Sequence, residues 1–444
     1  MLSCKPLFIL AVGAVIFLGT SAVRACPFCT ATSLTFCQEI KQSDVTVVAK
    51  LTFRPVLKDP LSSSLDIEKA KATFEVMRII RGEKFVEGKK TIRVTYFGRS
   101  KLGTRFLIMG IDPPKINWST PIPVGERAEK YLLRAVILPA KGGKRLEFFQ
   151  NYLEDKDEML ARDAYDEFAK APYDLVKQLK PKMNRDKIVG WIKDPEVPAS
   201  RRRLYLTMLG VCGGEKDLPM LEKMIVSGDR KQKAGFDALI GCYLTLKGVE
   251  GLKLIEDRFL RQDVVEGKKV DYSDTYNALQ ALRFHGQDGG VLPRPRIVEA
   301  MKLMLKRPRL ADLVIPDLAR WKDWSAMEQL VSMFKMSDPD TTWVRTPIFL
   351  YLRACPLPAA KKHLEVLAKL DPDAFERAQA FAPPEEAKDK KSSGAAKKSD
   401  TKKKDAAKTN TSAGASARQD WPLWAGVSMM TLAAVLLIRR TSRR

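Results

Sequence analysis

Three cysteines near the start of the chain offer the clearest chemistry in this sequence. Cys26, Cys29 and Cys37 lie close together, whereas the other cysteines are dispersed. Clustered thiols typically form disulfides if a chain is exported, as the N-terminal residues described below predict. Because three is an odd number, one thiol must stay free, become lipidated or pair elsewhere. Cys26, Cys29 and Cys37 are therefore candidates for a disulfide, and Cys26 is also a candidate functional N-terminus.

Other residue types provide little material for catalysis. His285 and His363 are the only histidines, and the chain contains no P-loop, dinucleotide-binding glycine motif or H-E-x-x-H motif. Residues 285–290 (HGQDGG) lack the acidic spacing of an EF-hand, so we interpret them as a turn between helices. We predict no enzymatic activity, no cofactor and no metal site.

Several reactive side chains are expected to be structural. Cys212, Cys242 and Cys355 fall within helical patterns, where a thiol behaves as a small core residue. Asp163 and Asp166 are expected on solvated faces of a helix.

The N-terminal residues predict a secretory signal peptide at 1–25. Lys5 precedes a short apolar run at 6–18, and small or short residues at 23 and 25 suit cleavage before Cys26. An uncleaved anchor and lipidation of Cys26 are the alternatives, the second disfavoured by Arg24.

The C-terminal residues predict a single transmembrane helix. Residues 421–438 carry no charge and match the thickness of a bilayer. Trp421 and Trp424 suit the outer interface, and Arg439 and Arg440 begin a basic cytoplasmic tail at 439–444. The body would then lie outside the cytoplasmic membrane, periplasmic or on the cell surface. A sorting signal that is later removed is the alternative.

The elements that must position the cysteines begin with a β domain at 26–142. Branched and aromatic residues separated by turn signals predict five strands, and a helical pattern follows at 125–136. Five short strands are typical of a small Greek-key barrel of the OB type. The predicted strands are 45–53, 72–80, 91–97, 105–111 and 116–121.

This arrangement resembles the netrin-like module, the family that includes the tissue inhibitors of metalloproteinases. The resemblance covers about residues 26–125 and implies an OB-like barrel. It also implies inhibition of a metalloprotease, with the α-amine and carbonyl of Cys26 presented to the zinc of the enzyme. The segments that carry it are Cys26, Cys29, Phe36-Cys37, 45–50 (VTVVAK), 74–76 (FEV), 81–82 (RG), 93–96 (RVTY) and 105–110 (RFLIMG).

The cysteine pattern departs from that family. Residues 38–211 contain no cysteine, so the disulfides that tie the family's N-terminus to later strands are absent. Cys29–Cys37 or Cys26–Cys37 pairing remains open. Residues 26–29 (CPFC) also resemble the redox dithiol of glutaredoxins, but no strand precedes them, which favours a structural disulfide over thiol exchange.

Residues 143–382 predict an α-solenoid. Amphipathic segments come in pairs with a period of about thirty-odd residues and turns between them. Residues 157–164 resemble the second helix of a HEAT repeat. The paired segments are 145–153 with 158–168, 203–211 with 218–226, 236–246 with 251–259, 276–284 with 297–305, and 348–354 with 359–370.

Residues 383–420 predict a disordered stalk, because they contain no Leu, Ile, Val or aromatic residue. The net charge of the chain is +24; the stalk contributes +4, the last six residues +4 and the signal +2, which leaves +14 on residues 26–382. Nucleic acid is not expected outside the cell, so we expect protein partners along the solenoid, and anionic lipid or wall polymer as further partners. The α+β chain is therefore interpreted as a membrane-anchored extracytoplasmic binding or scaffold protein.

Overall fold

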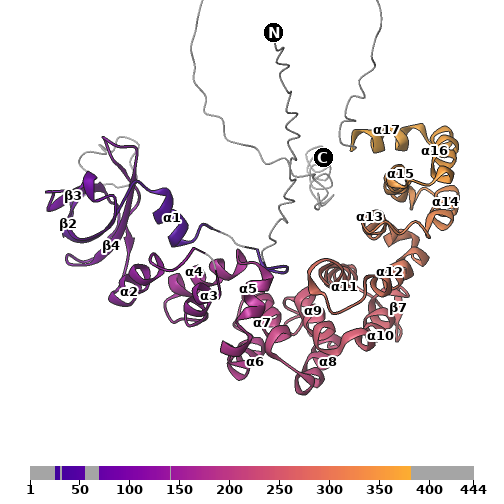
Figure 1. The fold of residues 1–444 in the computed structure, drawn as a ribbon, viewed down its shortest axis with the longest axis horizontal. Coiled ribbons are helices and arrows are strands. Elements are labelled where there is room, and N and C mark those ends of the chain that lie inside the picture. Colours follow the sequence, from indigo (N-terminus) through magenta and orange to yellow (C-terminus); the bar gives the residue numbers. More distant parts are fainter. Residues whose placement is uncertain (1–25, 31–32, 56–69, 141, 382–444) are drawn as a thin grey trace, which may run out of the picture.

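The computed structural model describes residues 26–30, 33–55, 70–140 and 142–381. The chain is α+β, with a curved antiparallel sheet at one end and helices that continue from it along an arc (Figure 1). The predicted signal peptide, stalk, transmembrane helix and tail, with Trp421, Trp424, Arg439 and Arg440, lie outside the described residues. Within those residues, no helix is long and apolar enough to cross a membrane.

The sheet is antiparallel and curls into a nearly closed barrel. Its strands run in the order β3-β2-β1-β4-β5, and β6 pairs with β4 beside β5. The predicted strand at 116–121 is instead divided into two short strands. The strands are β1 (Val45–Phe53), β2 (Lys71–Arg81), β3 (Thr91–Thr95), β4 (Arg105–Ile111), β5 (Asn117–Trp118) and β6 (Ile122–Pro123).

Both faces of β1 are buried, which explains its nearly continuous run of apolar residues. Val45, Val47 and Leu51 point into the barrel core with Phe74 and Phe106. Val48 belongs instead to the core shared with the helices. The barrel therefore packs against the helices and shares part of its core with them.

β2 and β3 form a hairpin, and the loop between them contains Gly82 and Gly88. Gly82 has a φ of 74°, and a Cβ there would lie 2.1 Å from the carbonyl oxygen of Asp44. Only glycine fits this turn, because it combines a left-handed backbone with a close approach to β1.

Two helices join the barrel to the rest of the molecule. α1 (Phe36–Gln42) precedes β1, and α2 (Glu126–Ala135) follows β6. The ring of Tyr131 on α2 is fully buried and packs against the rings of Phe148 and Phe149 on the next helix. The helical pattern at 125–136 predicted α2, whereas α1 was not predicted.

The remaining helices form a one-dimensional array, in which α7, α9 and α11 pack side by side and α13, α15 and α17 do the same. The paired segments predicted from sequence all fall on helices or helical turns. The array comprises α3 (Gly143–Gln150), α4 (Glu158–Ala169), α5 (Tyr173–Gln178), α6 (Arg185–Lys193), α7 (Ala199–Cys212), α8 (Leu218–Val226), α9 (Phe236–Lys247), α10 (Leu252–Ile255), α11 (Tyr272–Phe284), α12 (Arg294–Lys302), α13 (Ile315–Arg320), α14 (Met327–Met336), α15 (Arg345–Ala354), α16 (Pro358–Leu370) and α17 (Pro372–Ala380).

Two irregular connections interrupt the array. A π-helical turn at His285–Gly289 follows α11, so the expected turn at 285–290 is present, although it continues the helix before it. Another π-helical turn, Glu256–Leu260, leads to the short hairpin of β7 (Val264–Val265) and β8 (Lys268–Lys269). π-helical turns are rare and are frequent at functional sites.

Candidate functional site

The described part of the N-terminal segment, residues 26–30 and 33–35, lies on the inner side of the arc and reaches from α4 to α11 (Figure 1). We call it the docking segment. Its contacts join residues more than a hundred positions apart in the chain. This segment contains the cysteines that sequence analysis selected, so the candidate site is built around it.

The structure joins Cys26 to Cys29 in a disulfide and leaves Cys37 as a free thiol. The Cys29 N–H donates to the carbonyl oxygen of Cys26 at 3.2 Å, which closes a tight turn. Cys26 is only 3% exposed, whereas Cys29 is partly exposed. Cys37 lies on α1, where burial raises the pKa of its thiol to about 11. None of the three cysteines is placed as a reactive thiolate.

Phe28, within the disulfide turn, inserts its ring into the helical array. The ring centroids of Phe28 and Phe284 lie 4.9 Å apart, and those of Phe284 and Tyr173 lie 5.4 Å apart. On α9, a Cβ at Gly241 would lie 2.6 Å from Cζ of Phe28. The absent side chain of Gly241 therefore leaves the space that the ring occupies. We call this position, formed by Gly241 and Phe284 with Tyr173 packed against Phe284, the Phe28 seat.

His285 forms a hydrogen bond to the backbone of the Phe28 seat. It is 3% exposed, and its Nε2 lies 3.1 Å from the carbonyl oxygen of Gly241. Burial lowers the pKa of His285 to about 4, so the ring is neutral at physiological pH and donates this hydrogen bond. Its other ring nitrogen, Nδ1, is buried without a hydrogen-bond partner among the described residues.

The second anchor of the docking segment is a group of buried acids on α4, which corrects the expectation of solvated carboxylates. Asp163 is 4% exposed and Asp166 is 1% exposed. Asp163 accepts hydrogen bonds from the Phe36 N–H at 2.7 Å and from the Tyr131 hydroxyl at 2.5 Å. Asp166 accepts one from the Ser33 hydroxyl at 2.8 Å. These acids are buried because the docking segment and α1 cover them.

The charge state of this anchor depends on burial. Desolvation raises the pKa of Asp163 to about 6, although the hydrogen bonds from Tyr131 and Phe36 act in the opposite direction. Glu167, one turn further along α4, forms a two-pronged pair with Arg145 at 2.9 and 2.6 Å. The negative charge of these buried acids is therefore offset partly by the Arg145 guanidinium and partly by hydrogen bonds.

Two further contacts bind the backbone of the docking segment. The Tyr165 hydroxyl donates to the carbonyl oxygen of Thr30 at 3.4 Å. The Lys170 ammonium donates to the carbonyl oxygen of Ser33 and to the side chain of Gln38. Backbone contacts of this kind recognise an extended chain with little dependence on its sequence.

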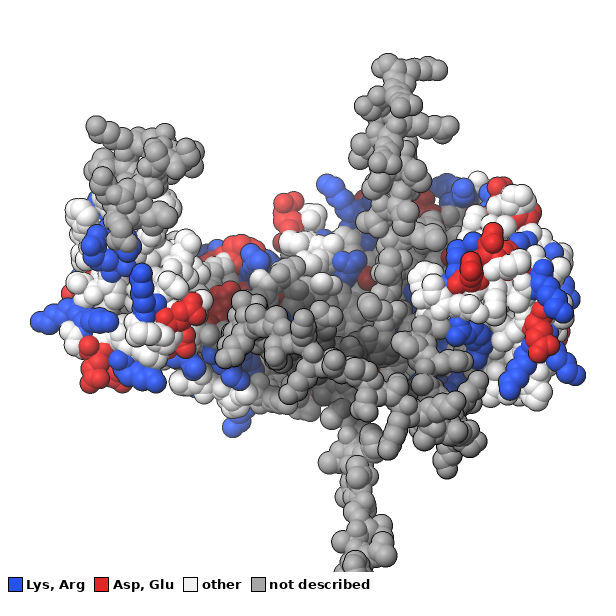
Figure 2. Space-filling view, turned by 90° about the horizontal axis from the view of Figure 1, so that it is seen from above, with Lys and Arg blue, Asp and Glu red and all other residues white. Residues whose placement is uncertain are grey.

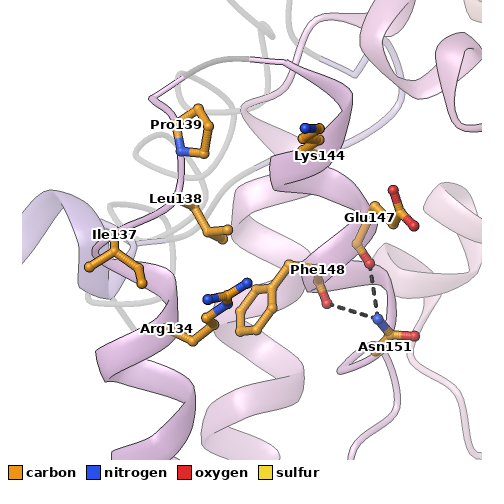
Figure 3. Close-up of a pocket in the computed structure, with 8 residues that line it drawn as sticks. All are labelled: Arg134, Ile137, Leu138, Pro139, Lys144, Glu147, Phe148 and Asn151. Carbon is orange, nitrogen blue, oxygen red and sulfur yellow. Dashed lines mark hydrogen bonds between the residues drawn. The ribbon is translucent and has the colours of Figure 1, made fainter.

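Two shallow hollows are among those on the surface of the described residues. Figure 3 shows one, of about 360 Å³, in which Arg134 lies beside the ring of Phe148 and Lys144 projects from the start of α3. The other, of about 730 Å³, follows the hairpin of β2 and β3 and includes Arg78 and Lys90. Neither contains a group of catalytic residues.

Basic side chains dominate the barrel end. Figure 2 shows Lys and Arg side chains projecting from that end, at the left of the view. The described barrel residues, 43–55 and 70–124, include thirteen Lys or Arg and five Asp or Glu. This excess gives the barrel a positive field that attracts anionic partners.

The dispersed cysteines lie apart from the docking segment. Cys242 and Cys355 are buried and Cys212 is partly buried. Burial raises the pKa of the Cys212 and Cys242 thiols. In the described residues, no three His, Cys, Asp or Glu side chains are grouped to hold a metal ion.

The cysteines were predicted from the sequence, but the residues that receive the docking segment and the start of α1 were not: Gly241, Phe284, His285, Asp163 and Asp166. One available signal was the sequence Thr35-Phe36-Cys37-Gln38, which has the spacing of a capping box and marks the start of α1.

Comparison with known protein families, curated proteins and solved structures found no match for the chain.

Proposed function

We propose that this chain is a membrane-anchored extracytoplasmic scaffold that binds extended polypeptides along a HEAT-like solenoid and carries a netrin-like, OB-type barrel. One observation carries the proposal: the docking segment already lies across α4, α9 and α11 as a bound peptide does. It is held by a ring inserted into an apolar seat and by side chains that contact its backbone. A surface that binds this segment in the same chain has the chemistry to bind another.

The shape of the array supports this function. Helices packed in one dimension form a long concave surface, which suits extended partners better than small substrates. The Phe28 seat provides the apolar anchor, and Tyr165 and Lys170 provide hydrogen bonds to main-chain carbonyl groups.

The basic barrel supports a second, anionic class of contact. Acidic proteins, anionic lipid headgroups and wall polymers are the partners available outside a cell. Attraction of this kind weakens as salt shortens the Debye length to about 3 Å at 1 M. The proposed anchor at 421–438 would keep the barrel and the solenoid close to such a surface.

The two alternatives for the N-terminus receive no support from the geometry. Inhibition of a metalloprotease requires the α-amine and carbonyl of Cys26 to reach a zinc ion, and Cys26 is buried against the helices. Catalytic thiol exchange requires a thiolate stabilised at the start of a helix. The next helix along the chain, α1, begins at Phe36, ten residues beyond Cys26.

Photo-crosslinking in intact cells tests the proposal with the full-length chain. A crosslinking residue at Thr30, which is exposed on the docking segment, should capture a polypeptide partner. The matched control is Lys253 on α10. This helix lies on the outer side of the arc (Figure 1), and the Lys253 side chain is 84% exposed. Equal capture at both positions, or none at Thr30 under both oxidising and reducing conditions, would contradict binding along the inner side.

A further inference from the structure

We propose that the Phe28 seat is a binding groove for an aromatic residue of another polypeptide, and that the Cys26–Cys29 disulfide gates it. This inference rests on the proposed scaffold function and adds its regulation. In the oxidised chain Phe28 fills the groove and excludes other peptides. In the reduced chain the turn loosens, Phe28 leaves, and the groove becomes accessible.

The seat has features of a dedicated site for a ring. Gly241 lies in the interior of α9, where glycine weakens a helix, yet any Cβ would collide with Phe28. Phe284 lies against the Phe28 ring and Tyr173 packs in turn against Phe284, each at a distance typical of aromatic pairs. The π-helical turn at His285–Gly289 begins beside it, and the hydrogen bond from His285 to Gly241 fixes the floor.

The disulfide acts on Phe28 directly because Phe28 lies inside the closed turn. Pro27 fixes one backbone torsion next to the ring, and the disulfide removes most of the remaining freedom. The undocked turn therefore has few conformations to gain when it leaves the seat. By the chain-entropy relation for a short loop, opening the disulfide should favour undocking by up to roughly twentyfold.

The redox step requires an external dithiol, such as a dithiol oxidoreductase of the same compartment. Its thiolate attacks the sulfur of Cys29, the partly exposed residue, and Cys26 departs as a thiolate that takes up a proton. The second thiol of the reductant then resolves the mixed disulfide and releases Cys29. Two electrons and two protons reach the chain, and the reductant becomes a disulfide.

The Cys26→Ser/Cys29→Ser variant represents the open state without added reductant. The probe is a fluorescent, oxidised cyclic peptide of sequence Cys-Pro-Phe-Cys-Thr, and its binding to the full chain is measured by fluorescence anisotropy. We expect binding at least tenfold tighter to the variant than to the oxidised wild type. Adding Gly241→Leu to the double variant should abolish binding, because the leucine side chain fills the vacated seat.

Equal affinity for the wild type and the double variant would overturn the gate. Binding that survives Gly241→Leu would overturn the seat as the site, and so would absence of binding to the double variant. These outcomes do not depend on a cellular partner. If Thr30 captures its partner equally from the wild type and the double variant, the scaffold function stands and the gate fails. If it captures nothing from either chain, the scaffold function fails while the peptide assay still decides the gate.

Discussion

Replacing Gly241 by alanine tests whether the ring of Phe28 holds the docking segment in place. The new Cβ would lie 2.6 Å from Cζ of Phe28, so the ring must leave the seat or shift within it. Complete removal of a buried phenylalanine costs about 3–5 kcal/mol. Phe28 is only partly buried, so we expect the docking segment to lose about 2 kcal/mol of its binding to the array.

This loss has the opposite sign to the effect on α9 itself. Alanine in place of an interior glycine stabilises a helix by about 1 kcal/mol. The melting temperature of the array should therefore stay constant or rise slightly while the docking segment loosens. A loss of about 2 kcal/mol makes the undocked state roughly thirtyfold more populated, so amide hydrogens protected by docking should exchange roughly thirtyfold faster.

Hydrogen–deuterium exchange measures this difference at the Cys29 and Phe36 amides, both of which donate hydrogen bonds in the docked state. The matched control is Gly210→Ala on α7, where a Cβ would lie no closer than 3.6 Å to its neighbours. The control should gain the same helical stability without faster exchange at Cys29 or Phe36. Equal exchange rates in the two variants would refute the steric role assigned to Gly241.

Three other predictions follow from buried groups. The unfolded His285 binds a proton near pH 6.5 and the folded one only near pH 4, so stability should fall as the pH drops from about 6.5 to 4, by at most about 3 kcal/mol. Chemical denaturation across this range should show a smaller fall for His285→Asn. Because burial raises the pKa of Cys37 to about 11, iodoacetamide at pH 8 should modify the reduced disulfide cysteines well before Cys37, as peptide mass spectrometry would reveal. Arg145→Ala leaves the buried Glu167 without its partner and should cost about 3 kcal/mol in urea unfolding. Lys182→Ala, which breaks an exposed pair, should cost less than about 1 kcal/mol, and equal losses would contradict the role of burial.

The elements with strong local patterns could be predicted from the sequence. β1 and β4 begin and end where the branched residues predicted, because both strands are largely buried. α8 matches its predicted bounds, 218–226, because its buried residues recur at helical spacing. Short helices such as α5 and α13 were missed because six residues give too little periodicity.

The docking site could not be predicted, because its contacts join distant segments. Asp163 and Asp166 have the spacing of a solvated helix face, and only the arrival of Ser33 and Phe36 buries them. In the sequence, Gly241 is only a residue that destabilises a helix, and its role is visible only once Phe28 packs against it. Local patterns determine the elements, whereas the pairing of elements more than a hundred residues apart depends on the whole fold.

The distance along the chain between Phe28 and its seat has a consequence for the order of assembly. A ribosome makes Phe28 more than two hundred residues before Phe284, at about 5–20 residues per second. The N-terminal turn therefore waits for ten seconds or more before α11 exists, long enough for the barrel to form first. Closure of the turn onto the array becomes a late step that reports on completion of α11. A chain truncated before α11 would keep its first residues exposed to proteases, so susceptibility of the N-terminus to cleavage would distinguish incomplete chains from finished ones.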